Sequence, residues 1–255
     1  MPSEFEGRVA LVTGGAGDGI GSHTVRRFAS LGAHVAVVDI HEKRCARVSE
    51  ETQAKFPKVK ILPCPGDIAD RARMDEVLAD VEKKAGPVDV LVNNAAENVL
   101  APVREFDPKD WDRVLSVDLT ACFYLIRKVL PGMCERRRGA IVNVASIAGW
   151  LGDANEGREG PYASAKAALL ALTRSVAFEA GPFGVRCNAV APGLIKSKFV
   201  LKYWDQFEPE IRRTPLRRVG EADDVVNAIE FLASERSSFI TGEALNLSGG
   251  WYMRP

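Results

Sequence analysis

The chain has 255 residues, of which 46% are hydrophobic and 27% are charged, the ordinary composition of a globular protein. Its 34 lysines and arginines balance 34 aspartates and glutamates, so it lacks the basic field that non-specific nucleic-acid binding requires. Five cysteines without a Cys-x-x-Cys pair argue against a disulfide framework or a zinc site. No apolar run reaches the roughly 18 residues of a membrane span. We therefore expect a soluble cytoplasmic protein with no metal site, no membrane segment and no nucleic-acid partner.

Hydrophobic periodicity predicts alternating strands and helices along the whole chain. The expected strands lie at residues 8–12, 34–39, 59–62, 88–92, 140–144 and 185–190, with a short final strand at 244–247. The expected helices are a stretch ending near Ser30, then 42–56, 70–85, 108–138, 162–180 and a last one around 225–232, with Pro131-Gly132 bending or ending the fourth. Apolar strands separated by helices imply a parallel sheet covered on both faces. The sequence thus predicts an α/β fold, a single doubly wound (Rossmann-type) domain over residues 1–255.

A glycine-rich loop, Thr13-Gly14-Gly15-Ala16-Gly17-Asp18-Gly19-Ile20-Gly21, follows the first predicted strand. Such a loop lets the backbone approach a phosphate closely, and the next helix presents free N–H groups to the anion. Asp39 ends the second strand, where a carboxylate can accept both ribose hydroxyls of an adenosine. A carboxylate there would also repel a 2′-phosphate. We therefore predict a dinucleotide site that prefers NAD to NADP, with helix periodicity turning the nearby cation Arg44 to solvent.

Tyr162-Ala163-Ser164-Ala165-Lys166 opens a predicted helix, and residues four apart share one face of a helix. The phenol and the ammonium should therefore enter the same space, where a positive charge lowers the tyrosine pKa from about 10. Ser146 follows the fifth strand and could donate a hydrogen bond to a carbonyl oxygen as negative charge develops on it. The three side chains predict acid–base chemistry beside a nucleotide.

Over essentially its whole length the sequence resembles the short-chain dehydrogenase/reductase family, in the branch of about this length. The resemblance lies in the glycine loop, Asp67-Ile68, Asn93-Asn94-Ala95-Ala96, Ser146, the Tyr162/Lys166 pair, Pro192-Gly193-Leu194-Ile195-Lys196-Ser197 and residues 240–250. It implies that Tyr162 is the acid/base, that Lys166 lowers its pKa and holds the nicotinamide ribose, and that Ser146 orients the substrate oxygen. It also implies cofactor contacts from Gly14, Asp18, Gly19, Ile20, Asp39, Asp67, Ile68, Asn94, Ala95, Tyr162, Lys166, Pro192, Gly193, Ile195 and Ser197. A homotetramer is implied as well, with helices 108–138 and 162–180 as its interface.

Four features depart from the family pattern. The loop between Gly14 and Gly19 is one residue longer than usual, and Ala96 replaces a glycine. Ser146 and Tyr162 are 16 positions apart, across a polar loop (150–160) that we expect to shape specificity.

The fourth departure is Asp118, which stands where the family has a catalytic asparagine that holds a water next to the lysine. If the main-chain carbonyl carries that water, the substitution is tolerated. If the side chain takes part, a carboxylate near Lys166 would raise the lysine pKa and partly cancel its pull on Tyr162. We hypothesise an active enzyme with an altered pH optimum.

Residues 196–215 are expected to form a lid over the substrate. Phe199, Tyr203, Trp204 and Phe207 recur there at near-helical spacing, and a lid needs apolar surface to exclude water; ordinary packing is the alternative.

The resulting hypothesis is an NAD-dependent oxidoreductase that interconverts a small secondary alcohol and a ketone. Two alternatives stay open. One is a 3-oxoacyl thioester (acyl-carrier-protein or CoA) reductase of the same family, which would usually prefer NADPH. The other is a catalytically silent cofactor-binding protein, for which Asp118 is the only indication.

Overall fold

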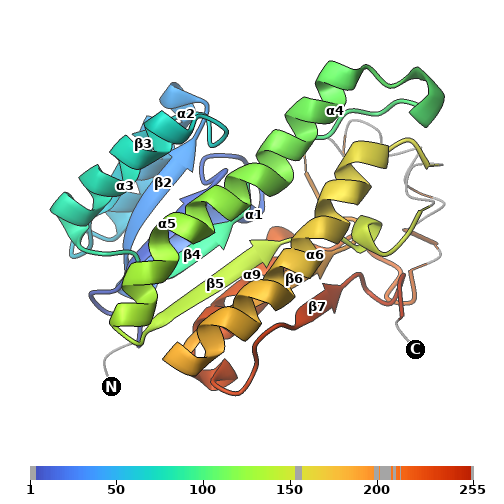
Figure 1. Cartoon of the computed structure of the whole chain (residues 1–255). Helices are drawn as coiled ribbons and strands as arrows, with labels where there is room; N and C mark the ends of the chain where they lie inside the picture. The colour runs from blue at the N-terminus through green and yellow to red at the C-terminus, as the bar shows by residue number, and fades with distance from the viewer. Residues whose placement is uncertain are drawn as a thin grey trace.

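The computed structural model describes residues 4–152, 157–197, 201, 208, 211–212 and 214–253. In this part of the chain seven parallel strands form one sheet in the order β3-β2-β1-β4-β5-β6-β7 (Figure 1). The strands are β1 (Val9–Thr13), β2 (His34–Asp39), β3 (Ile61–Pro65), β4 (Val90–Asn93), β5 (Gly139–Val144), β6 (Val185–Pro192) and β7 (Ala244–Leu247). The strand order reverses between β1 and β4, and ligands of such sheets bind at the carboxyl ends beside this switch point. The predicted Rossmann-type fold is confirmed.

Helices cover both faces of the sheet. They are α1 (Ile20–Ser30), α2 (Glu42–Lys55), α3 (Arg71–Ala85), α4 (Pro108–Leu115), α5 (Ala121–Glu135), α6 (Gly160–Ala180) and α9 (Ala222–Ala233), with short turns η1 (Val103–Glu105), η2 (Ser116–Thr120), η3 (Ile147–Gly149), η5 (Gly181–Phe183) and η6 (Glu235–Ser237). Successive strand residues face opposite sides, so Ala10 and Val12 of β1 pack with α1, α2 and α9. Val9 and Leu11 pack with α3, α5 and α6. Figure 1 shows α5 and α6 side by side across one face.

Two strands start two residues later than the periodicity predicts. The third lies at Ile61–Pro65 rather than 59–62, and the fourth at Val90–Asn93 rather than 88–92. Pro63 and Pro65 interrupt the apolar pattern, but β3 is at the edge of the sheet. A residue without an N–H group is tolerated there, because no further strand needs its hydrogen bond.

The predicted helix 108–138 is instead two helices, α4 and α5, joined by the π-helical turn η2. Pro131-Gly132 does not end the second helix, which continues to Glu135. A π turn holds an extra residue and often occurs at functional sites. Here it carries Asp118, which is completely buried. Among the helices in the described part of the chain, none is long and apolar enough to cross a membrane.

Candidate active site

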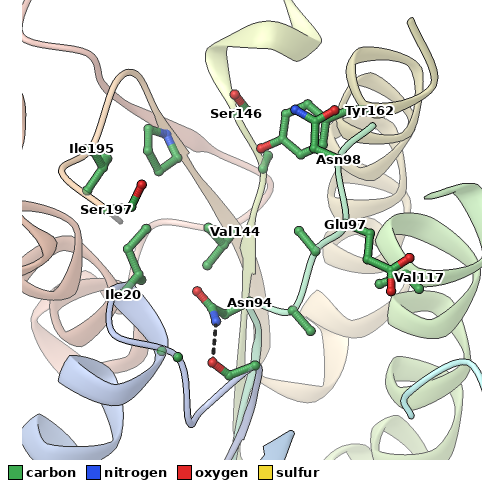
Figure 2. Close-up of a pocket in the computed structure, with 18 of the residues that line it drawn as sticks. Ile20, Asn94, Glu97, Asn98, Val117, Val144, Ser146, Tyr162, Ile195 and Ser197 are labelled. Carbon is green, nitrogen blue, oxygen red and sulfur yellow. Dashed lines mark hydrogen bonds between the residues drawn. The ribbon is translucent and has the colours of Figure 1, made fainter. Parts of the chain in front are cut away.

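A cavity of about 690 Å³ opens at the carboxyl ends of the central strands. Most of the predicted site residues line it, namely Gly14, Gly19, Ile20, Asp39, Asp67, Ile68, Asn94, Ala95, Ser146, Tyr162, Pro192, Gly193, Ile195 and Ser197. Figure 2 shows Ser146 and Tyr162 at one end, with Ile20 and Asn94 toward the other. The fold therefore brings residues from seven separate segments together around one cavity.

Three predicted site residues do not line this cavity. Lys166 and Asp118 are buried, with side chains only 2% and 0% exposed. Asp18 lines a neighbouring hollow of about 370 Å³, and its carboxylate forms an ion pair with Arg47 at 3.7 Å. Asp18 is thus exposed and lies outside the predicted cofactor cavity.

The glycine loop leaves open space in front of the N-terminus of α1. Gly14 has φ +62°, and a Cβ there would lie 2.9 Å from the Cα of Ala95; its carbonyl accepts a hydrogen bond from Asn94 Nδ2 at 3.2 Å (Figure 2). A Cβ on Gly19 would meet nothing within 4 Å, and no side chain caps α1. The first N–H groups of a helix have no partner within it and suit a phosphate. This cradle fits the pyrophosphate of a dinucleotide.

Asp39 both lines the cavity and anchors the glycine loop. Its Oδ2 accepts the Ala16 N–H at 3.1 Å, and its Oδ1 accepts the His41 N–H at 3.0 Å. Burial raises the pKa of Asp39, against the lowering effects of the Ala16 N–H and of Arg44. Arg44 is exposed, as predicted, but it also borders the cavity.

Tyr162 and Lys166 lie one turn apart on α6, and the lysine Nζ is 5.3 Å from the centre of the tyrosine ring. The Nζ donates to the Val144 carbonyl at 3.1 Å and pairs with Asp118 Oδ2 at 3.1 Å. The other carboxylate oxygen of Asp118 accepts the Glu97 N–H at 2.8 Å. The lysine is therefore a buried charge over the face of the phenol ring, and it is paired with a buried acid.

The electrostatics of this group differ from the sequence-based expectation in one respect. Burial has the largest effect and lowers the pKa of Lys166, but Asp118, Tyr162 and Cys122 together outweigh it, so the net pKa of the lysine is raised, as expected. Burial raises the pKa of Tyr162, Lys166 lowers it, Asp118 raises it, and the net result lies above the ordinary value. Lys166 thus lowers the pKa of Tyr162 and Asp118 opposes it, as predicted, but the sequence did not predict the larger effect of burial. Burial and Asp118 together exceed the effect of the lysine.

Ser146 follows β5 and caps the short helix η3. Its Oγ accepts the Ala148 N–H at 3.1 Å, which leaves the hydroxyl proton available for a partner in the cavity. Around Tyr162, where burial dominates and raises the pKa, a hydrogen bond with Ser146 acts in the opposite direction. The hydroxyl is thus placed to donate to an oxygen held beside the phenol.

Two charged residues on the cavity wall, Arg113 and Glu97, were not predicted from the sequence. Arg113 on α4 donates to Asp67 Oδ2 at 2.7 Å and to both carboxylate oxygens of Glu97, at 2.8 and 2.7 Å. Glu97 directly follows the Asn-Asn-Ala-Ala turn, and that position was the available signal. Arg113 gave none, because a charged residue on an amphipathic helix is ordinary.

The segments on either side of the expected lid (196–215) are joined by a parallel bridge between Ile195 and Gly220. Phe199, Tyr203, Trp204 and Phe207, like residues 153–156 of the 150–160 loop, lie outside the described residues. Within the residues described, no group of three or more His, Cys, Asp or Glu side chains is arranged to hold a metal ion.

Comparisons with known proteins agree with this architecture. A family model described as enoyl-(acyl carrier protein) reductase matches residues 15–252. The chain is 37% identical over 251 residues to the (2S)-[(R)-hydroxy(phenyl)methyl]succinyl-CoA dehydrogenase subunit BbsD of Thauera aromatica, covering 96% of this chain and 97% of that one. It is 37% identical over 247 residues to the 3-oxoacyl-[acyl-carrier-protein] reductase FabG of Thermotoga maritima, covering 96% and 98%.

The fold leads to the same group of proteins. The crystal structure of a 3-oxoacyl-[acyl-carrier protein] reductase from Brucella melitensis with bound NAD superimposes with a TM-score of 0.88 at 33% identity, covering 99% of this chain and 94% of that one. Sequence, fold and the arrangement of the cavity together show that the chain belongs to the short-chain dehydrogenase/reductase family of oxidoreductases.

Proposed function

We propose that the protein is an NAD-dependent oxidoreductase that interconverts a secondary alcohol and a ketone, with Tyr162 as the acid and base. The observation that carries the proposal is the shared cavity. A phosphate cradle at Gly19 lies along the same hollow as the hydroxyl groups of Ser146 and Tyr162. Membership of an oxidoreductase family supports the reaction class.

The residues of the site suit both halves of the proton transfer. A bound nicotinamide dinucleotide would supply the hydride acceptor for oxidation, or the donor for reduction. In oxidation, the Tyr162 phenolate would take the proton from the hydroxyl oxygen of the alcohol as the hydride leaves the carbon that bears this hydroxyl. In reduction, the phenol would donate its proton to the oxygen of the ketone. Ser146 would donate a hydrogen bond to the substrate oxygen, where charge develops. We propose that Lys166 acts mainly through its charge, because its side chain is buried and does not line the cavity.

The residues along the cavity suit NAD in particular. The N-terminus of α1 would hold the pyrophosphate, Asp39 the adenosine ribose, and Asp67 with Ile68 the adenine. Asn94, Ala95 and residues 192–197 would line the nicotinamide half. The Asp39 carboxylate would disfavour a 2′-phosphate, and the bound NAD of the Brucella relative is in line with this choice.

A 3-oxoacyl thioester reductase is the second candidate. The relatives from Thermotoga maritima and Brucella melitensis carry that activity in their names. A 3-hydroxyacyl thioester is itself a secondary alcohol, so the same tyrosine chemistry would serve. The need for a thioester separates the two candidates, whereas a preference for NAD does not, because the Brucella 3-oxoacyl reductase has NAD bound.

The test is a matrix of two cofactors against substrates. Oxidation would be measured with NAD⁺ and NADP⁺ over a panel of secondary alcohols, and reduction with NADH and NADPH over ketones that include acetoacetyl-CoA. We expect turnover with NAD(H), reduced about 100- to 10,000-fold by Tyr162→Phe with NADH binding retained. Activity confined to thioesters, with either cofactor, would support the second candidate. NADH binding without turnover of any substrate would indicate a catalytically silent protein.

A further inference from the structure

A line of charged side chains runs along one wall from the adenine end of the cavity to the catalytic end. It passes from Asp67 through Arg113 and Glu97 to Asp118 and Lys166. Each neighbouring pair is joined by an ion pair or hydrogen bond of 3.1 Å or less. The first three line the cavity, and the last two are buried behind it. Figure 2 shows Glu97 on this wall, on the same side of the cavity as Tyr162.

Arg113 holds two carboxylates with one guanidinium. Its Nη1 donates to Asp67, while Nε and Nη2 grip both oxygens of Glu97, with all three distances between 2.7 and 2.8 Å. A bidentate, charge-assisted contact of this kind fixes the orientation of a carboxylate, and a lysine cannot reproduce it. The side chain is 36% exposed, so solvent screens its charge. We therefore expect the contact to orient the carboxylates rather than to contribute much to the free energy of folding.

Glu97 connects this clamp to the buried pair through its backbone. Its side chain is held by Arg113, and its own N–H donates to Asp118 Oδ1 at 2.8 Å. Because a gripped side chain restrains the backbone that carries it, the position of this N–H depends on the guanidinium. Asp118 in turn faces Lys166 with its other oxygen.

We infer that Arg113 is a positioning residue that aims the Glu97 N–H at Asp118 and holds the Asp67 carboxylate at the adenine end of the cavity. The inference rests on the proposed function, because Asp118 reaches the reaction only through Lys166 and Tyr162. Losing the clamp should therefore change two separable properties, namely dinucleotide affinity and the pH at which Tyr162 ionises.

The direction of the pH effect follows from Asp118. A hydrogen bond to a carboxylate favours its charged form, so without the Glu97 N–H the acid becomes easier to protonate. The fraction of Asp118 that is protonated no longer opposes Lys166, so Tyr162 should ionise at a lower pH. Alcohol oxidation, which needs the phenolate, should move to lower pH with it.

The remaining groups around the phenol are unchanged by this substitution. They are Lys166 and Glu159 near the start of the same helix, the buried Cys122 thiol on α5 beside Lys166 and Asp118, and the Ser146 hydroxyl after β5.

The test compares Arg113→Gln, Arg113→Lys and Asp118→Asn with the double variant Arg113→Gln/Asp118→Asn. NADH affinity is read from nicotinamide fluorescence. Ionisation of Tyr162 is read from tyrosinate absorbance, as the difference from the matching protein with Tyr162→Phe, and from the pH profile of kcat. We expect Arg113→Gln to weaken NADH binding about tenfold, the equivalent of one charge-assisted hydrogen bond. We also expect it to lower the ionisation midpoint by less than Asp118→Asn does.

The double variant decides whether Arg113 acts through Asp118. Two residues that act through one contact give non-additive effects. In the Asp118→Asn background, Arg113→Gln should therefore weaken NADH binding without moving the midpoint further. An additive shift of the midpoint, or unchanged NADH affinity in Arg113→Gln, would overturn the inference. Arg113→Lys should resemble Arg113→Gln, whereas rescue by lysine would show that charge alone matters.

Two controls keep the result separate from folding and from the proposed reaction. Arg236 also donates to a glutamate, Glu230, at 2.7 Å, and it does not line the cavity. Arg236→Gln should leave NADH affinity and the midpoint unchanged. The thermal midpoint of each variant shows whether it folds, and Arg113→Lys carries the test if Arg113→Gln does not. If no substrate is turned over, the proposed function fails, while the binding and absorbance measurements still decide the role of Arg113.

Discussion

Lys166 and Asp118 form a 3.1 Å ion pair between side chains that are 2% and 0% exposed, and the lysine Nζ lies over the ring of Tyr162, 5.3 Å from its centre. Water does not screen charges at such a depth, so each strongly affects the ionisation of the other. The pair brings one positive and one negative charge close to the phenol. The pull of the lysine on the tyrosine proton is therefore partly cancelled.

Asp118→Asn should lower the pH at which Tyr162 ionises. The carboxylate raises the pKa of the phenol after burial and against Lys166, and an amide removes that contribution while it can still accept a hydrogen bond from the lysine. We expect the rising limb of alcohol oxidation to move down by about one pH unit, the ordinary scale of environmental shifts. Turnover of the variant against pH measures the shift. An unchanged profile would remove Asp118 from the mechanism.

Gly19→Ala should fold normally but bind dinucleotide poorly. A Cβ at Gly19 meets no atom within 4 Å and would occupy the space in front of the α1 N–H groups. NADH affinity should fall about tenfold or more, as for a lost charge-assisted contact. Gly21→Ala is the matched contrast, because its Cβ would lie 2.1 Å from the Gly14 carbonyl oxygen. That variant should lose thermal stability, and equal stability of the two proteins would contradict this account of the loop.

Asp39→Ser should narrow the preference for NAD over NADP. The variant loses the carboxylate that would bind the ribose hydroxyls and repel a 2′-phosphate. We expect kcat/KM for NAD⁺ to fall about 10- to 100-fold, the scale of a hydrogen bond to a charged group, with a smaller change for NADP⁺. The carboxylate also anchors Ala16. If both cofactors decline equally, anchoring of the loop is its main role.

Phe178→Glu should weaken the homotetramer that the family resemblance implies. Phe178 on α6 is 90% exposed and Phe123 on α5 is 46% exposed, and the two helices lie side by side in Figure 1. Burying a phenylalanine contributes about 1.5–3 kcal/mol, and a charge in its place would oppose association. Native mass measured at several protein concentrations checks this, with Phe239→Glu, another fully exposed ring, as the control. Identical masses for both variants and the parent would exclude this face as the interface.

That the site residues lie close together was predictable from local patterns in the sequence. Hydrophobic periodicity identified parallel strands, and the carboxyl ends of parallel strands meet at one edge. The residues that follow β1, β2 and β5 therefore had to be neighbours, which brought Gly19, Asp39 and Ser146 together. The boundaries of β3 were not predictable in this way, because only its place at the sheet edge makes Pro63 and Pro65 acceptable.

By itself, then, the amino-acid sequence determined the fold class, the phosphate cradle and the placement of Tyr162 and Lys166 on one helical face. Each of these follows from a local pattern of spacing along the chain. Only the tertiary structure decided how the phenol ionises. The pKa of Tyr162 depends on the combined effects of burial, of Lys166 on the same helix and of Asp118 on a π turn that the hydrophobic periodicity did not predict. The clamp of Arg113 on Asp67 and Glu97 likewise joins three separate segments. The effects of several charges on one pKa, and contacts between distant segments, depend on distances in space. Those distances are set only when the chain has folded.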